Sequence, residues 1–509
     1  MIFLLYQLYN FFAIHLLLIF ELYYIINKNH SGEIFLIMII KKNEIYKIKI
    51  IDLSSDGQGI GKIENFIVFT EKTIPGDFVE IKILKTNKTY GYGKLIKIIS
   101  QSSDRIKSKC DIADKCGGCS LQYMNYNAQL NHKKKIVANC LERIGKFKNI
   151  NNIITKIIGM DNPYNYRNKA QFPVKEKALQ IHKNPVCSVD NPVDSVDIGF
   201  FSKRSHDIIN LDNCNISNEI NIAIINIFKI FINQNINDFS PYNEINHTGL
   251  IRHIFTRIGF YTGEIMVCIV INGDNFFECK ELIDKLSQIK GMTSIMLNIN
   301  KNKTNVILGD KNKILWGKDY ITDYLCGKKF KISVNSFYQI NPIQTEKLYN
   351  KIIEFANIDK TAICIDAYCG IGTISIILSP YIKKVYSIEI INQAVNDAKE
   401  NAKLNNIKNA EFITGKSEEI IPELINNGEN IDLLIVDPPR KGCDIKLIES
   451  IIKSKIKKLI YISCDPATLA RDLNLLCETT YELKKVQPID MFPHTMHVET
   501  VVLLHCKNF

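Results

Sequence analysis

A cysteine and two aspartates occupy positions from which they could act together on a substrate. Cys464 follows residues 458–463, a short apolar run that predicts a buried strand. Two earlier apolar runs end in the same way, one at Asp366 and one at Asp437. Open α/β sheets bind ligands at the carboxyl ends of their strands. The pattern therefore predicts a thiol nucleophile beside a cofactor pocket.

The elements after Asp366 favour a nucleoside cofactor. A glycine turn at Gly370 and Gly372 connects the predicted strand to a predicted helix, and a second strand ends at Glu389, 23 residues after Asp366. Glycines let a ligand approach the backbone, and an acidic residue at this spacing can accept hydrogen bonds from ribose hydroxyls. The loop lacks the G-x-G-x-x-G pattern of pyrophosphate binding, which favours a nucleoside without phosphates, such as S-adenosylmethionine. A plain tight turn is the alternative interpretation.

The Asp437-Pro-Pro-Arg440 segment restricts the chemistry further. Neither proline can continue a sheet ladder, so the chain must turn away from the sheet at this edge. Enzymes that methylate amines usually have an aromatic residue after the prolines, where a flipped base can stack. Arg440 in that position argues against attack by an exocyclic amine.

Residues from about 42 to the carboxyl terminus resemble the RNA (uracil-5-)-methyltransferase family. Four motifs carry the resemblance and stand in the family's order: residues 366–373, 437–442, 463–472 and 497–501. The resemblance implies a class I S-adenosylmethionine-dependent methyltransferase domain with a Rossmann-like α/β fold. It is nearest to the 23S ribosomal RNA branch, because of a cysteine motif and an amino-terminal barrel. A transfer RNA enzyme and a non-catalytic RNA-binding assembly factor remain alternatives.

Uracil chemistry assigns roles to two of these residues. Carbon 5 of uracil is a poor nucleophile, but addition of a thiolate to carbon 6 produces an enolate whose carbon 5 can accept a methyl group. Cys464 is the candidate nucleophile. Glu499, a lone carboxylate in an apolar run, is the candidate base that then removes the carbon 5 proton. By resemblance, S-adenosylmethionine is bound by Gln339, Tyr368, Glu389 and Asp437.

A second group of residues could bind a metal. Cys110, Cys116 and Cys119 are separated by five residues and then by two glycines, and closely spaced thiolates suit a soft metal centre. Cys140, Cys187 and Cys214 all lie downstream as possible fourth ligands. The resemblance implies Cys214 and a [4Fe–4S] cluster with a structural or RNA-positioning role. Zinc is the rival, since four cysteines also suit it.

The region before this motif predicts an RNA-binding barrel. Short alternating runs separated by glycine turns between residues 42 and 100 indicate a small OB-type barrel, which resembles a TRAM domain. The net charge of +11 favours a polyanionic partner. Residues that could contact single-stranded RNA are Lys72, Lys85, Lys88, Tyr90, Tyr92 and Lys94.

Length and composition complete the predicted organisation. The 509 residues divide into an apolar extension at 1–41, the barrel at 42–100, a central α+β domain with the cluster at 101–325 and the methyltransferase domain at 326–509. Fifteen cysteines without the spacing of secreted proteins favour a reducing cytoplasm. We expect a monomer without a stable membrane partner. Residues 1–20 carry no charged side chain and are long enough to span a bilayer, but Met38 is the favoured start of the native chain.

Overall fold

The computed structural model describes residues 24–28, 34–38, 40–177, 195–274 and 279–507. The apolar run at 1–20 and Cys187 lie outside the described residues. Within the described residues, no helix is long and apolar enough to cross a membrane. The chain forms two compact units, Met1–Ile106 and Lys107–Phe509.

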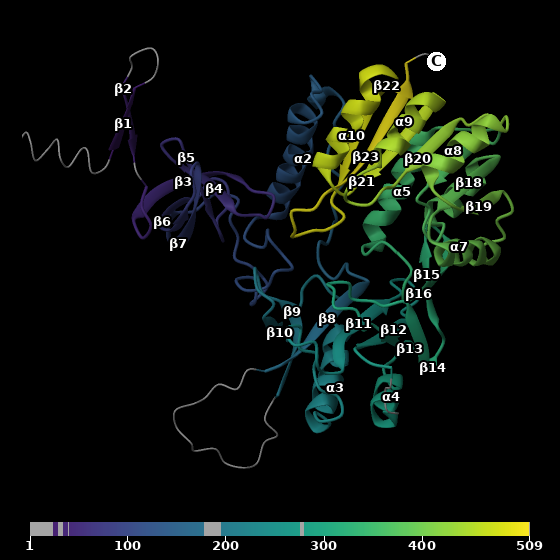
Figure 1. The fold of residues 1–509 in the computed structure, drawn as a ribbon, viewed down its shortest axis with the longest axis horizontal. Coiled ribbons are helices and arrows are strands. Elements are labelled where there is room, and N and C mark those ends of the chain that lie inside the picture. Colours follow the sequence, from purple (N-terminus) through teal and green to yellow (C-terminus); the bar gives the residue numbers. More distant parts are fainter. Residues whose placement is uncertain (1–23, 29–33, 39, 178–194, 275–278, 508–509) are drawn as a thin grey trace, which may run out of the picture. The chain divides into compact units, whose positions relative to one another are not determined.

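The first unit contains an antiparallel hairpin and a closed five-stranded barrel (Figure 1). The hairpin pairs β1 (Tyr24–Lys28) with β2 (Ile34–Met38). The barrel, in the order β3-β4-β5-β7-β6, consists of β3 (Ile45–Leu53), β4 (Gly59–Ile63), β5 (Phe66–Thr70), β6 (Phe78–Thr86) and β7 (Tyr90–Ser100). Alternate residues of its strands point inward and build a core that includes Ile50, Val68 and Ile81. The small closed barrel expected from the sequence is thus confirmed.

The second unit begins with helix α2 (Tyr126–Arg143), η1 (Ile150–Asn152) and a seven-stranded sheet in the order β10-β9-β8-β11-β12-β13-β14. Its strands are β8 (Lys169–Glu176), β9 (Val196–Phe201), β10 (Ile208–Asn210), β11 (Ile251–Ile258), β12 (Ile265–Ile271), β13 (Met292–Ile299) and β14 (Lys311–Gly317). Helices α3 (Ile220–Gln234) and α4 (Lys280–Ser287) cover one face of this sheet and share its apolar core (Figure 1). A hairpin of β15 (Tyr320–Leu325) and β16 (Lys328–Ser333) and helix α5 (Pro342–Ala356) lead to the next sheet.

The second sheet of this unit has the order β19-β18-β17-β20-β21-β23-β22. Its strands are β17 (Ile363–Ala367), β18 (Lys384–Glu389), β19 (Ala410–Thr414), β20 (Leu433–Val436), β21 (Lys458–Ser463), β22 (Tyr481–Ile489) and β23 (Glu499–Cys506). They alternate with α6 (Thr373–Leu378), η2 (Ser379–Tyr381), α7 (Asn392–Leu404), α8 (Ser417–Asn426), α9 (Ile445–Ser454) and α10 (Pro466–Thr479). All neighbouring strands are parallel except at β23, which runs antiparallel to both β21 and β22. Apolar cores line both faces of the sheet, as expected for buried parallel strands.

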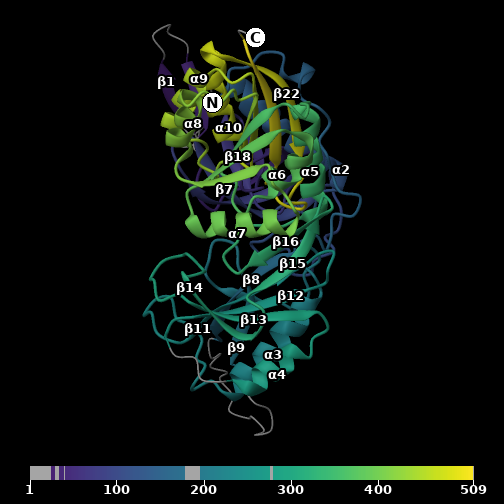
Figure 2. The ribbon, with the colours of Figure 1, turned by 90° about the vertical axis from the view of Figure 1, so that its right-hand side faces the viewer.

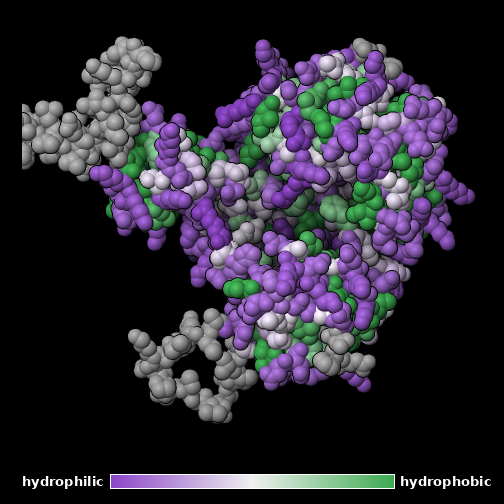
Figure 3. All heavy atoms as spheres, in the orientation of Figure 1, coloured by the Kyte–Doolittle hydropathy of each residue, from purple (hydrophilic) through white to green (hydrophobic). Residues whose placement is uncertain are grey.

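Helix α2 packs against this second sheet rather than against the first. It contacts α10 and β22, and its Val137 and Leu141 belong to the same apolar core as Val486 of β22. Residues 153–158 then run beside β22 through bridges at Ile154 and Ile158. Helix α7 lies against β16 on the side that faces the first sheet (Figure 2). In Figure 3, the surface of this unit is hollowed between its two sheets.

Candidate active site and cysteine cavity

The predicted cofactor residues meet at one edge of the second sheet. Ala367 is paired with Val436 on one side and with Ile388 on the other. The next residues along these strands, Tyr368, Asp437 and Glu389, therefore lie side by side. The chain moves outward from β17 to β18 and β19, and it returns on the other side with β20 and β21. This is the switch point where open α/β sheets bind ligands.

The loop after β17 is shaped by backbone conformations that glycine favours. Gly370 has a φ of +54°, and no atom lies within 4 Å of the position of a Cβ there. Its N–H donates to Oε2 of Glu389 at 3.1 Å, which connects the loop to β18. Tyr368 also has a positive φ, +67°, which is unusual for a large side chain and typical of functional sites. At Gly372, with a φ of +80°, a Cβ would come within 2.9 Å of the Phe412 ring.

Two aspartates give this edge a shared negative charge. Asp366 is fully buried and accepts a hydrogen bond from Ser375, but its Oδ1 has no hydrogen-bond partner. Burial raises the pKa of Asp366 to about 7. Burial, together with the charge of Asp366, raises the pKa of Asp437 to about 7 as well. A cationic ligand would favour the ionised carboxylates, so the site suits a sulfonium or ammonium group.

The structure brings Cys464 and Glu499 together. Ser463 of β21 pairs with Thr500 of β23, and the strands are antiparallel, so the next pair at this edge is Cys464 and Glu499. Cys464 directly precedes Asp465, which caps helix α10 by accepting from the N–H groups of Ala467 and Thr468 at 2.9 and 3.0 Å. The thiol thus lies at a helix amino terminus, where a thiolate is stabilised.

The pKa values of Cys464 and Glu499 depend on their burial, on the charges near them and on one exposed arginine. Burial, then the charges of Glu499 and Asp437, raises the pKa of the Cys464 thiol to about 11, and Arg440 opposes this shift. Glu499 is 3% exposed, and burial with the charge of Asp437 raises its pKa well above the ordinary value. Arg440 opposes that shift too. Sequence reasoning used Arg440 only to argue against amine substrates, although its position three residues after Asp437 could have suggested this electrostatic role.

Gln339 lies two residues before Asn341, the N-cap of helix α5. Asn168 fixes the backbone that follows the Gln339 side chain: the Asn168 side-chain amide donates to the carbonyl of Gln339 at 2.9 Å, and the Asn168 backbone N–H donates to the carbonyl of Ile340 at 3.0 Å. The side chain is half-buried. Its role in cofactor binding stays a prediction.

The four cysteines chosen as metal ligands line one cavity of about 420 Å³. They are Cys110, Cys116, Cys119 and Cys214. Burial, together with the neighbouring Cys214 and Cys116, raises the pKa of Cys119 to about 12. Within the described ranges, no group of three or more His, Cys, Asp or Glu side chains is arranged to hold a metal ion. The structure therefore gathers the predicted thiols around a common space but does not close them into an ion site.

Several long-range contacts fix the position of the cysteine segment. The N–H of Gly117 donates to the carbonyl of Phe201 at 3.0 Å, and Cys116 forms a bridge with Ser202. Arg440 and His497 also line the cavity, so it reaches the methyltransferase sheet edge. Cys140, weighed as an alternative ligand, packs in the apolar core of helix α2 and does not line the cavity.

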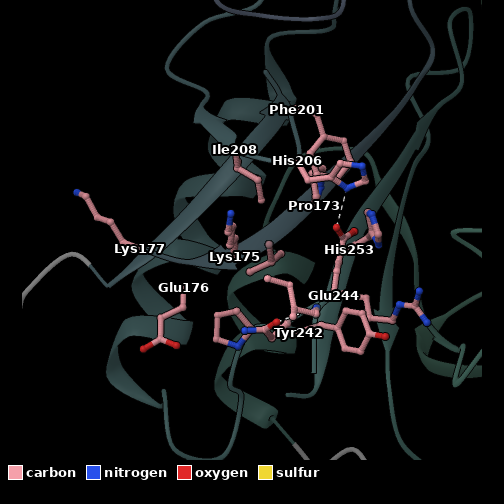
Figure 4. A pocket seen from close by; sticks show the side chains of 15 residues that line it. Pro173, Lys175, Glu176, Lys177, Phe201, His206, Ile208, Tyr242, Glu244 and His253 are labelled. Carbon is pink, nitrogen blue, oxygen red and sulfur yellow. Dashed lines mark hydrogen bonds and ion pairs between the residues drawn. The ribbon is translucent and has the colours of Figure 1, made fainter. Parts of the chain in front are cut away.

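A second cavity, of about 360 Å³, lies in the first sheet of this unit and contains none of the predicted site residues (Figure 4). His253 and Tyr242 line it, and a hydrogen bond of 2.7 Å between Nδ1 of His206 and Oε2 of Glu244 spans part of its wall.

The strand order, the antiparallel β23 and the acidic switch point define the fold of an S-adenosylmethionine-dependent methyltransferase. The chain matches the tRNA (Uracil-5-)-methyltransferase family over residues 278–507 and the TRAM domain over residues 41–96. It belongs to the tRNA (uracil-5-)-methyltransferase family and is an RNA methyltransferase. This confirms RNA as the class of substrate and a TRAM domain as its RNA-binding module.

Relatives and a solved structure agree with this assignment. An uncharacterized RNA methyltransferase of Clostridium tetani is 47% identical over 467 residues, which cover 91% of this chain and 97% of that protein. One of Halalkalibacterium halodurans is 42% identical, covering 92% and 98%. The tRNA (uracil-54, C5)-methyltransferase of Pyrococcus abyssi, solved with S-adenosyl-L-homocysteine, is 26% identical, with a TM-score of 0.68, covering 90% of this chain and 100% of that one. S-adenosylmethionine is accordingly the methyl donor that family and fold imply.

Proposed function

We propose that the protein methylates carbon 5 of uridine in RNA, with 23S ribosomal RNA as its substrate, through a covalent bond between Cys464 and carbon 6 of the base. The observation that carries this proposal is the pairing of β21 with β23. It places a thiol and a buried carboxylate next to each other, beside the acidic switch point.

In the proposed mechanism, the Cys464 thiolate adds to carbon 6, and the electrons of the C5–C6 double bond move onto the oxygen at carbon 4. Arg440 and the amino terminus of helix α10 stabilise the thiolate, whose pKa is otherwise raised by burial. When bound, S-adenosylmethionine supplies an electrophilic methyl group to carbon 5, and Asp437, Glu389, Tyr368 and Gln339 would hold it. Glu499 then removes the proton from carbon 5, the double bond reforms, and the C6–S bond breaks.

The raised pKa of Glu499 suits its proposed task. A carboxylate in this environment is a stronger base than one in water, and its burial excludes competing proton donors. The charge of Asp437 raises the pKa of both Glu499 and Cys464, so it strengthens the base but opposes formation of the thiolate, and Arg440 must offset it at Cys464.

Replacing Glu499 with Gln tests the order of these steps. Glu499→Gln should add to RNA and accept the methyl group, but it should fail to release the product. We expect a denaturation-resistant protein–RNA band that carries labelled methyl and that is absent from the double variant with Cys464→Ala. An unmethylated adduct would place Glu499 before methyl transfer, and normal turnover would remove it from the mechanism.

We further propose that Cys110, Cys116, Cys119 and Cys214 hold a [4Fe–4S] cluster. Four soft thiol donors around one cavity fit such a group, and the cavity is larger than a single ion requires. Cationic iron would also relieve the mutual repulsion of the thiolates. Protein purified without oxygen should be brown and contain iron, and Cys214→Ser should lose the iron while Cys140→Ser and Cys187→Ser keep it. Colourless protein with one zinc would contradict the proposal.

The choice of ribosomal RNA rests on the combination of barrel and cysteine motif. The Pyrococcus abyssi protein is a tRNA (uracil-54, C5)-methyltransferase, which keeps transfer RNA as the alternative substrate. Mass-spectrometric mapping of 5-methyluridine in both RNAs from a deletion strain decides between them. Loss from transfer RNA alone would overturn the ribosomal assignment, and loss from neither would favour an assembly factor.

A further inference from the structure

The segment that leads into Glu499 has no regular secondary structure, yet all its residues except Phe492 and His497 are buried. Residues 490–498 connect β22 to β23, and among them Asp490, His494 and Val498 are at most 2% exposed. His494 has a positive φ of +66°, which the surrounding contacts must maintain. Two of these contacts come from residues more than 350 positions earlier in the chain, and others come from Tyr166, Asn341 and Gln344, whose side chains donate to carbonyls of residues 490–493.

Gln129 of helix α2 connects three parts of the molecule. Its side-chain nitrogen donates to the carbonyls of Leu121 and Met124 at 3.2 and 2.8 Å. Its side-chain oxygen accepts from the backbone N–H of His494 at 3.0 Å. Gln129 is fully buried, so each of these hydrogen bonds replaces one that water cannot supply.

Lys133, one turn further along helix α2, holds the start of the segment. It forms an ion pair with Asp490 in which both side chains are fully buried, and it donates to the carbonyl of Phe492 at 2.9 Å. Tyr126 donates to the other carboxylate oxygen of Asp490 at 2.8 Å. A buried ion pair is weak evidence for stability but can fix a unique geometry.

Further hydrogen bonds fix the part of the segment next to Glu499. The side chain of Thr495 donates to the carbonyl of Phe492 at 2.8 Å, and the N–H of His497 donates to the Thr495 hydroxyl at 3.3 Å. Glu499 follows two residues later as the first residue of β23. Cys464 is positioned separately, since it lies between Ser463, whose hydroxyl accepts from the N–H of Asp465 at 3.1 Å, and the capped end of α10.

We infer that Gln129 and Lys133 are positioning residues for the base step: they hold segment 490–498 so that the Glu499 carboxylate reaches the carbon 5 proton after methyl transfer. This inference rests on the proposed role of Glu499. It assigns helix α2, outside the matched methyltransferase region, a selective effect on product release rather than on attack by Cys464.

Single-turnover kinetics with labelled methyl donor tests the inference, because adduct formation and adduct decay are measured separately. Gln129→Ala should form the methylated adduct within about twofold of the wild-type rate but release it at least about tenfold more slowly, since small misplacements of a catalytic group are costly. Gln129→Glu keeps the size and the acceptor but sets a buried carboxyl group against the carbonyls of Leu121 and Met124, so it should show the same split at least as strongly. Lys133→Met combined with Asp490→Asn, which leaves no buried charge unpaired, should behave like Gln129→Ala.

Val137→Ala is the matched control. Val137 lies on the same helix, is fully buried and shares an apolar core with Leu469 and Leu473 of α10, so its truncation loosens α2 without removing these hydrogen bonds. Formation and release should change together in Val137→Ala. The inference is overturned if Gln129→Ala and Gln129→Glu slow both steps equally or leave release unchanged. If Glu499→Gln accumulates the methylated adduct but the two Gln129 variants do not, only the inference about Gln129 and Lys133 fails. If Glu499→Gln accumulates no adduct, the proposed role of Glu499 as the base fails as well.

Discussion

The sheet edge and the cysteine cavity assemble their side chains in different ways. At the edge, Tyr368, Asp437 and Cys464 each follow directly after a strand, and the hydrogen bonds of one sheet align them. The cavity instead gathers thiols from a loop at 110–119 and from Cys214, which is about a hundred residues away in the sequence. The edge is therefore fixed by its scaffold, whereas we expect the cavity to depend on what its thiols bind.

The largest effect should come from removing the nucleophile without disturbing the scaffold. Cys464→Ala should lower kcat by about 10⁴-fold or more, the scale expected when a covalent nucleophile is lost. Binding of S-adenosylmethionine should stay within about twofold, because the strands and not the thiol align the cofactor residues. Calorimetric titration and thermal melting measure the two outcomes. A large loss of cofactor affinity would show that the edge is less independent than the sheet implies.

Removing a thiol from the cysteine cavity should change the stability and the metal content of the protein rather than the chemistry at the sheet edge. Cys119→Ser should lose the proposed metal centre and lower the Tm, by about 1 °C for each kcal/mol of lost stabilisation in a unit as large as Lys107–Phe509. Cys364→Ser is the comparison in the second sheet, because Cys364 is fully buried in β17 and binds nothing in the proposed scheme. It should destabilise the protein without changing its metal content. Equal metal content in all variants would mean that the cavity is fixed by its scaffold too.

The acidic switch point predicts a smaller, pH-dependent effect. Asp437, with a pKa of about 7, is largely protonated at pH 6 and must lose its proton before it can stabilise a cation. The Kd for S-adenosylmethionine should thus be about tenfold weaker at pH 6 than at pH 8, and binding at pH 6 should release a proton. Titrations in buffers of different ionisation enthalpy measure that release. In Asp437→Asn, the Kd for S-adenosylmethionine should depend much less on pH. If its pH dependence were unchanged, Asp366 and not Asp437 would be the group that titrates.

The barrel should contribute the smallest effect, on RNA affinity alone. Phe69, Tyr90 and Tyr92 form a cluster with ring centroids 5.8 Å apart, and both tyrosines are half-buried. Tyr92→Ala should weaken RNA binding by about 1 kcal/mol, near fivefold, because a stacking surface is lost. Tyr92→Phe keeps the ring and should bind normally. Filter binding at fixed salt measures both, and a fall in kcat at saturating RNA would contradict a binding role.

The residues at the sheet edge could be predicted because their positions are encoded locally. Apolar runs that end at Asp366, Asp437 and Cys464 mark strand ends, and strand ends of a parallel sheet share an edge. Glu499 was detectable as a lone carboxylate in an apolar run. Even the barrel follows from short alternating runs and glycine turns.

The remaining contacts could not be predicted, because they join residues far apart in sequence. Lys133 and Asp490 are 357 positions apart, and Lys133 stands in a basic run, residues 132–135, of a kind that usually lies on a solvated helix face. Spacing alone could not decide between Cys140 and Cys214 as cavity residues either. Helix α2 was placed by sequence in the central region, yet its apolar side packs on the second sheet because its Val137 and Leu141 complete that core.

One pair of hydrogen bonds connects the two regions. The N–H groups of Ser120 and Leu121, which directly follow Cys119, both donate to the carbonyl of His494 at 3.0 Å. Damage to the cysteine site would therefore reach the segment before Glu499, while Cys464 kept its own supports. An enzyme damaged in this way would not lose all activity. It would still add to RNA and methylate it, but it would stay covalently bound to its product, so each molecule would react only once.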